Sequence, residues 1–130
     1  MITNSVAETI QAGRDFAAKL NPDSVVLMYG EMGAGKTHFV KGIAQGLGIK
    51  DNITSPTFAL VNEYPGLYHF DLFRIHSEDD LYAIGFYDYN GIIVAEWAEN
   101  VPELQGDFTV RIEKIDENTR QISFKNLGTG

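Results

Sequence analysis

Apolar residues recur at helical spacing in two stretches of the chain. The first covers roughly residues 5–20 and begins at Ser5, with Glu8 three residues later, which is the spacing of a capping box. Its periodic positions are Val6, Ile10, Gly13, Ala17 and Leu20. The second covers residues 39–47 and is followed by Gly48, a residue that commonly ends helices. Both stretches therefore predict amphipathic helices.

Short apolar runs predict the strands. Residues 24–29 and 91–95 are almost wholly apolar, as expected for strands buried on both faces of a sheet. Residues 58–64 and 67–70 flank a Pro-Gly turn and predict a hairpin. A brief helix is expected over 78–84.

Apolar and polar residues alternate at the end of the chain. The alternation covers 108–113 and 121–124, on either side of an Asp-Glu-Asn turn at 116–118. This pattern predicts an antiparallel hairpin with one exposed face.

Composition limits the size and setting of the protein. A chain of 130 residues with 44% hydrophobic and 22% charged residues fits a single globular domain, residues 1–130. No apolar run is long enough to cross a bilayer, and the first ten residues do not resemble a signal peptide. The absence of cysteine excludes disulfides, thiolate catalysis and sulfur-based zinc sites. We expect a cytoplasmic protein with no membrane partner.

The charge balance is strongly acidic. Eighteen acidic and 10 basic residues give a formal charge of -8, with Lys36, Lys41 and Lys50 as the densest basic run. Binding to nucleic acid by a whole surface requires a basic stripe. Any connection to RNA is therefore expected to be indirect.

The segment GEMGAGKT at residues 30–37 matches the P-loop pattern, with Gly30, Gly35, Lys36 and Thr37 at the required positions. In this motif backbone N–H groups surround the phosphates, the lysine reaches the outer phosphates and the hydroxyl holds magnesium. An apolar strand precedes the motif and an amphipathic helix follows it, which is the context it requires. We predict phosphate binding by an α/β chain with a three-layer P-loop NTPase-like fold. Its central sheet is expected to be mixed but mainly parallel, with a C-terminal antiparallel hairpin.

ATP is favoured over GTP. The chain has no Asn-Lys-x-Asp motif for reading guanine. It also has no Asp-x-x-Gly motif, because Leu72, Phe73 and Arg74 follow Asp71. ATP with Mg²⁺ is therefore the expected ligand.

Two carboxylates end apolar runs and are candidates for holding the metal and the attacking water. Asp71 follows residues 68–70, and Glu96 follows residues 92–95. The pattern alone leaves open which of the two faces the metal.

Other residues near these motifs have two interpretations each. Residues 54–58 form either a nucleotide-sensing loop or an ordinary turn, and Trp97 is either a core residue or a neighbour of the nucleotide. His69 is interpreted as a hydrogen-bonded core residue rather than a base. Arg74 either neutralises phosphate charge or pairs with the acidic cluster at 78–80.

Four motifs in this order and spacing resemble the TsaE family, also called YjeE. They are GEMGAGKT at 30–37, SPTF at 55–58, HFDLFR at 69–74 and EW at 96–97. The resemblance covers nearly the whole chain. It implies a small bacterial P-loop ATPase required for the threonylcarbamoyladenosine modification of tRNA. The implied partners are TsaD and TsaB, whose turnover the ATPase supports, with tRNA contacted only indirectly.

The resemblance also implies the roles of individual residues. Lys36, Asp71 and Glu96 would be catalytic, and Thr37 with Glu96 would hold Mg²⁺. Ser55 and Thr57 would lie on a switch-like loop. The full set implied to bind the nucleotide is Glu31, Met32, Gly33, Ala34, Gly35, Lys36, Thr37, His38, Ser55, Thr57, Trp97 and Arg120.

Three positions depart from the usual family pattern. Met32 stands where leucine is usual and Phe73 where tyrosine is usual, and both keep apolar bulk. His38 stands where a hydroxyl residue is common, so contacts to the phosphates or base are expected to differ.

Two alternatives to the ATPase interpretation are open. A small-molecule kinase would share the loop, but it usually needs an arginine-bearing lid, and this chain has four arginines and no long insertion after Asp71. A nucleotide-dependent binding switch without hydrolysis would use the same loop. Loss of hydrolysis with retained ATP binding on changing Glu96 would favour the ATPase.

Overall fold

The computed structural model describes residues 1–31, 33–54 and 60–127, and in these residues seven strands form one sheet. The strands are β1 (Ile2–Thr3), β2 (Val25–Tyr29), β3 (Val61–Tyr64), β4 (Leu67–Asp71), β5 (Ile92–Glu96), β6 (Phe108–Lys114) and β7 (Arg120–Asn126). The helices are α1 (Val6–Ala17), α2 (Lys36–Gly46), α3 (Glu78–Ala83) and the short 3₁₀ helices η1 (Phe86–Asp88) and η2 (Ala98–Asn100). Within these ranges, no helix has the length and apolar character needed to span a membrane.

The sheet is mixed, with a parallel centre. The strand order is β1-β7-β6-β2-β5-β4-β3. β2 pairs in parallel with β5 and β6, and β4 pairs in parallel with β5. The outer pairs β3–β4, β6–β7 and β1–β7 are antiparallel. The predicted α/β fold with a mixed sheet and a C-terminal antiparallel hairpin is confirmed.

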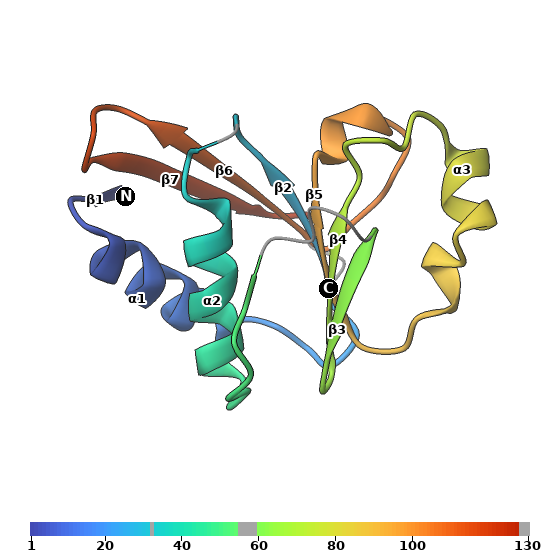
Figure 1. Cartoon of the computed structure of the whole chain (residues 1–130), viewed down its shortest axis with the longest axis horizontal. Coiled ribbons are helices and arrows are strands. Elements are labelled where there is room, and N and C mark those ends of the chain that lie inside the picture. Colours follow the sequence, from blue (N-terminus) through green and yellow to red (C-terminus); the bar gives the residue numbers. More distant parts are fainter. Residues whose placement is uncertain (32, 55–59, 128–130) are drawn as a thin grey trace.

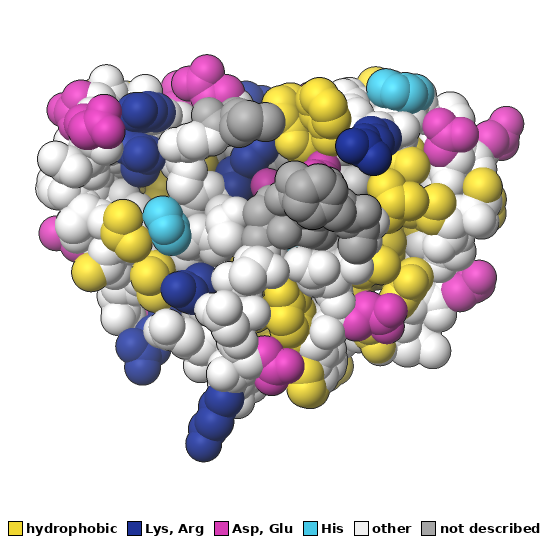
Figure 2. Space-filling model, viewed as in Figure 1, with side chains coloured by type: hydrophobic (Ala, Val, Ile, Leu, Met, Phe, Trp, Pro, Cys, Tyr) yellow, Lys and Arg dark blue, Asp and Glu magenta, His cyan; other side chains and the backbone are white. Residues whose placement is uncertain are grey.

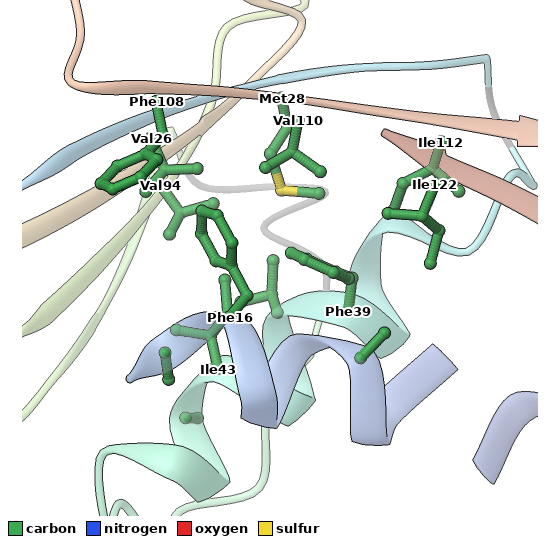
Figure 3. Close-up of a cluster of buried hydrophobic side chains, with 14 of the residues drawn as sticks. Phe16, Val26, Met28, Phe39, Ile43, Val94, Phe108, Val110, Ile112 and Ile122 are labelled. Atoms are coloured by element: carbon green, nitrogen blue, oxygen red, sulfur yellow. The ribbon is translucent and has the colours of Figure 1, made fainter. Parts of the chain in front are cut away.

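Helices α1 and α2 cover one face of the sheet, and α3 lies on the other (Figure 1). The larger core lies under α1 and α2, where Phe16 packs against Phe39 and Phe108 at ring-centroid distances of 5.5 and 5.2 Å. Val94 and Met28 line the sheet side of this core (Figure 3). Alternation along β2 and β5 places every second side chain here.

A second core occupies the opposite face. Leu27, Phe70 and Ile93 point into it from the sheet, and Leu81 of α3 and Phe86 of η1 close it. The strands of the centre are thus apolar on both faces, which is why their sequences read as continuous apolar runs.

The predicted helices and strands agree with the structure except at several ends. The first helix ends at Ala17 rather than near residue 20. Its capping residue is Ser5, whose hydroxyl accepts a hydrogen bond from the Glu8 N–H, as the spacing predicted. β3 begins at Val61, and residues 55–59 of the predicted segments lie outside the described ranges. The two-residue strand β1 was not predicted, because two residues carry no periodicity.

The P-loop helix α2 crosses α1 at very close range. A Cβ atom added to Gly42 would lie 1.9 Å from the carbonyl oxygen of Ile10, and one added to Gly13 would lie 2.1 Å from that of Phe39. Both neighbours are backbone atoms, which cannot move aside as a flexible side chain can. Glycine at these two positions sets the spacing of the helices and so the position of the P-loop.

We expect Gly42→Ala to lower the free energy of unfolding by about 1–3 kcal/mol, because the added methyl group overpacks the crossing. Chemical denaturation measures the change. Gln45→Ala, at an exposed position of the same helix, is the matched control and is expected to stay within about 0.5 kcal/mol of wild type. A Gly42→Ala protein as stable as wild type would contradict the close crossing.

Candidate functional site

Three parallel strands end level with one another at one edge of the sheet. Met28 of β2 is paired with Glu96 of β5, and Glu96 with Asp71 of β4. Paired residues in a sheet project to the same face, so both carboxylates share the face that Met28 occupies under α1 and α2. The loop that follows β2 begins beside them. The two candidate carboxylates and the P-loop are thus brought together.

The P-loop backbone requires glycine at three positions. Gly30, Gly33 and Gly35 have φ values of 145°, 82° and 99°, which side chains rarely allow. Gly30 also lies against β6, where a Cβ atom would come within 2.5 Å of the Ile112 carbonyl oxygen. At Gly33 nothing lies within 4 Å of that position. The loop is packed against the sheet at its start and open further along, which suits a backbone that surrounds phosphates.

Helix α2 begins without the cap that the other two α-helices have. Ser5 caps α1 and Ser77 caps α3 with their hydroxyls, and acidic residues follow in the first turn of each. At α2 the capping position is Gly35, which offers no side-chain oxygen, and the first turn holds no acidic residue. The N–H groups and the positive end of the helix dipole are therefore available to an anion.

Lys36 lies inside the site rather than on the surface. Its side chain is 6% exposed, and its Nζ donates a hydrogen bond of 2.6 Å to the carbonyl of Gly30 across the loop. The same Nζ is 3.8 Å from Oε1 of Glu96 and 4.4 Å from the centre of the Trp97 ring. The charge of Lys36 is thus held by one carbonyl, one carboxylate and one aromatic face.

Glu96 is buried at the end of β5, between the ammonium group of Lys36 and the imidazole of His69. Its Oε1 faces Lys36, and its Oε2 contacts Nε2 of His69. His69 has no exposed surface and comes from the neighbouring strand β4. The interpretation of His69 as a hydrogen-bonded core residue is confirmed, and its partner is the candidate metal-binding carboxylate.

Asp71 and Trp97 flank Glu96. Oδ1 of Asp71 accepts a hydrogen bond of 2.9 Å from the N–H of Phe73, which fixes the turn after β4. The Phe73 ring stands edge-on to Trp97 at 5.0 Å. Among the residues that the structure describes, Trp97 is the one non-glycine residue with a positive φ, which is 60°. The Trp97 ring lies over Lys36 and also packs against the second core, so the residue has a place in both.

Arg120, from β7, holds the P-loop from the other side. Its Nε donates to the carbonyl of Ala34 at 3.0 Å, and its Nη2 lies 3.4 Å from that of Gly33. Nη1 donates to carbonyls of the preceding turn, including that of Asp116 at 2.8 Å. The hydrogen bond from the Thr119 side chain and those from backbone N–H groups lower the pKa of the Asp116 carboxyl below its usual value. Arg120 therefore joins the C-terminal hairpin to the loop.

A small cavity adjoins the loop beyond Gly35. Thr9 of α1, His38 of α2 and Arg120 line it, together with residues of the turn before β7. His38 and Arg120, both predicted to bind nucleotide, thus face one space next to the P-loop.

The described part of the structure does not place every predicted residue in the site. Met32, Ser55 and Thr57 lie outside the described ranges. Glu31 is exposed on the loop. Arg74 is exposed, and among residues 1–31, 33–54 and 60–127 it forms no ion pair with the acidic cluster at 78–80.

The donor set suits Mg²⁺ that is bound together with phosphate. Within the described part of the chain, no group of three or more His, Cys, Asp or Glu residues could hold a metal ion by itself. Mg²⁺ commonly uses one or two protein oxygens, several waters and the phosphates of a substrate. Lys36 of α2 contacts Glu96 of β5, and Thr37 is the next residue of α2. The Thr37 hydroxyl and the Glu96 carboxylate therefore belong to the two elements, α2 and β5, that meet at the loop.

Sequence reasoning missed two contacts that shape this site. Gly30 against Ile112 and Arg120 against Ala34 join residues more than eighty positions apart, and no local pattern indicates them. The contact between His69 and Glu96 had a usable signal. His69 stands two residues before Asp71, so both belong to one face of the strand.

Comparisons with known proteins agree on one family. The family model described as threonylcarbamoyl adenosine biosynthesis protein TsaE matches residues 3–122. A protein from Treponema pallidum named tRNA threonylcarbamoyladenosine biosynthesis protein TsaE is 41% identical, over 94% of this chain and 96% of its own length. A Bacillus subtilis protein of the same name is 35% identical, over 93% of this chain and 81% of its own length.

A solved structure supports the same conclusion. The crystal structure of Bacillus subtilis YdiB is 31% identical in sequence and superposes with a TM-score of 0.75. The match covers 98% of this chain and 84% of that one. The fold is thus shared along with the sequence.

Arg120→Ala is expected to weaken any nucleotide binding at the P-loop at least about tenfold, because charge-assisted hydrogen bonds to the loop carbonyls are lost. The fluorescence of Trp97, the one tryptophan of the chain, measures binding next to Lys36. Lys125→Ala, an exposed change on the same strand, is the control and should have the same nucleotide affinity as wild type. Equal affinities for the two variants would contradict the role given to Arg120.

Proposed function

The chain belongs to the TsaE family, and we propose on this basis that it binds and hydrolyses ATP with Mg²⁺ in tRNA threonylcarbamoyladenosine biosynthesis. The observation that carries the proposal is the buried contact between Lys36 of the P-loop helix and Glu96 at the end of β5. It joins the lysine expected to reach the phosphates to the carboxylate expected to face the metal. A loop that served only as a turn would not need a buried charge pair behind it.

When phosphates bind to the P-loop, Lys36 would exchange its present hydrogen-bond acceptor for phosphate oxygens. Lys36 now donates to the Gly30 carbonyl, and phosphate oxygens would replace that carbonyl as its acceptor. The uncapped N–H groups of α2 would donate to the same phosphates. The nucleotide would extend from the loop along the side where Thr9, His38 and Arg120 line a small cavity.

Thr37 and Glu96 would hold Mg²⁺, which when bound neutralises charge on the phosphates. Glu96 is buried and accepts from His69, so its carboxylate has a fixed position. Once Lys36 turns toward the phosphates, Oε1 of Glu96 loses its present neighbour and faces the loop. These contacts support Glu96 as the metal ligand, the role implied by the family resemblance.

Asp71 would orient the attacking water. It is paired with Glu96 on the neighbouring strand, so it stands beside the phosphate site without lying inside it. Its Oδ1 is held by the Phe73 N–H, which leaves Oδ2 to accept a hydrogen bond from water. The geometry suits a base or orienting group, since a positioned acceptor directs a water toward the outer phosphate.

Protein partners would complete the function. We propose that the counterparts of TsaD and TsaB bind this protein, that ATP hydrolysis supports their turnover, and that the reaction takes place in the cytoplasm. The formal charge of -8 and the mixture of acidic and basic side chains in Figure 2 favour contact with tRNA through these partners.

Glu96→Ala should keep ATP binding in the absence of Mg²⁺ within a few-fold of wild type. We expect it to lose hydrolysis by about a hundredfold or more, since the carboxylate at the reacting phosphates is gone. Lys36→Ala, in contrast, should lose both ATP binding and hydrolysis. The measurement follows ATP hydrolysis and tRNA modification in a mixture with the TsaD and TsaB counterparts.

Glu99→Ala, an exposed carboxylate three residues beyond Glu96, is the matched control and should behave as wild type. If Lys36→Ala supported modification at the wild-type level over many turnovers, the proposal would be wrong. If Glu96→Ala supported modification without hydrolysis, the protein would be a binding switch instead.

The isolated protein is expected to bind tRNA weakly, because its net charge of -8 repels the phosphate backbone. Titration of labelled tRNA at physiological salt tests this expectation. A sub-micromolar complex would show that the charge argument fails.

A further inference from the structure

His69 is buried at the site, and the proposed function uses it only as the partner that fixes the Glu96 carboxylate. It lies on β4 two residues before Asp71, so both side chains point to the face covered by α1 and α2. Glu96 projects from β5 onto the same face, one strand away. The imidazole of His69 is fully buried and contacts this carboxylate. This buried ring thus has a single described hydrogen-bond partner, and that partner is a candidate metal ligand.

The two oxygens of Glu96 have different neighbours. Oε2 contacts Nε2 of His69, and Oε1 lies 3.8 Å from Nζ of Lys36. A carboxylate held at one oxygen cannot rotate freely about its last bond. The hydrogen bond to His69 therefore determines where the other oxygen points, and Oε1 points toward the loop.

The surroundings of the ring identify the donor. Nδ1 of His69 is buried and has no hydrogen-bond partner among the described residues. A neutral imidazole carries one N–H and one acceptor nitrogen, and an ionised carboxylate has only acceptors. A hydrogen on Nδ1 would be a buried donor without a partner, and would leave two acceptors facing each other at Nε2. The hydrogen therefore belongs on Nε2, which donates to Oε2 of Glu96.

We propose that His69 is a positioning residue for Mg²⁺ binding, acting through Glu96. By holding Oε2 it directs Oε1 toward Thr37 and the phosphates when Lys36 turns away from the carboxylate. The inference rests on the proposed function, because only a site that binds a metal needs this orientation. Partners that orient a metal ligand typically contribute about 10- to 100-fold to metal affinity.

A purely structural role makes a different prediction. If the hydrogen bond only satisfied a buried carboxylate, losing it would lower the melting temperature and leave the effect of Mg²⁺ unchanged. A positioning role requires that the effect of Mg²⁺ on nucleotide binding itself become smaller.

Two variants of nearly the same shape separate the roles. His69→Gln keeps an N–H donor near the position of Nε2, and His69→Met has similar length without a donor. The affinity for a non-hydrolysable ATP analogue is measured by Trp97 fluorescence, once with Mg²⁺ and once with a chelator. The ratio of the two affinities is the readout, and it does not depend on hydrolysis.

We expect His69→Met to reduce this ratio by about 10- to 100-fold and His69→Gln to stay within about threefold of wild type. Affinity with the chelator should be unchanged in both. In a Glu96→Ala background, His69→Met should change the ratio no further. His69→Leu is measured in the same way in case His69→Met does not fold.

A wild-type ratio in His69→Met, with or without a lower melting temperature, would overturn the positioning role and leave the proposed function standing. A wild-type protein whose affinity is the same with and without Mg²⁺ would overturn the proposed function, and the inference with it.

Discussion

A buried carboxylate requires partners, and the one at Glu96 joins the main parts of this site. Removing a charge from water is costly unless it is paired and hydrogen-bonded. Glu96 is 6% exposed at the edge where parallel strands end, and its partners come from two other elements. Lys36 brings the P-loop helix α2, and His69 brings strand β4. The charge thus holds the loop, the helix and the sheet in one arrangement before any ligand is bound.

The P-loop also depends on residues far from it in the sequence. The carbonyl of Ile112 leaves room for Gly30 and for no larger residue, and the guanidinium of Arg120 holds the carbonyl of Ala34. On the helix side, the crossing of α1 and α2 at Gly13 and Gly42 sets the height of α2 over the sheet. The C-terminal hairpin and the first helix therefore belong to the phosphate site. Residues from almost the whole length of the chain therefore help to position the P-loop.

Much of the fold could be predicted because its signals are local. The glycine loop, the buried strands and the two amphipathic helices each follow from a pattern within about fifteen residues. The strand β1 could not be predicted because two residues carry no periodicity, and the end of α1 could not because the chain continues from Ala18 to Leu20 in turns that keep nearly the same spacing. Within the site, Asp71 and Glu96 were found as carboxylates at strand ends. The spacing of His69 and Asp71 shows that these two share a face, whereas the register that places both beside Glu96 pairs two strands and is not expressed in the sequence.

The division of roles among the charged side chains is the centre of this account. In the proposed function Lys36 would serve the phosphates, Glu96 the metal and Asp71 the water, and the present contacts of each side chain support that assignment. A crystal structure with Mg²⁺ and a non-hydrolysable ATP analogue tests the division most directly. We predict that Nζ of Lys36 leaves the Gly30 carbonyl for the outer phosphates, and that Mg²⁺ lies between Thr37 and Oε1 of Glu96. A nucleotide bound with Lys36 still on Gly30, or with Mg²⁺ away from Glu96, would contradict it.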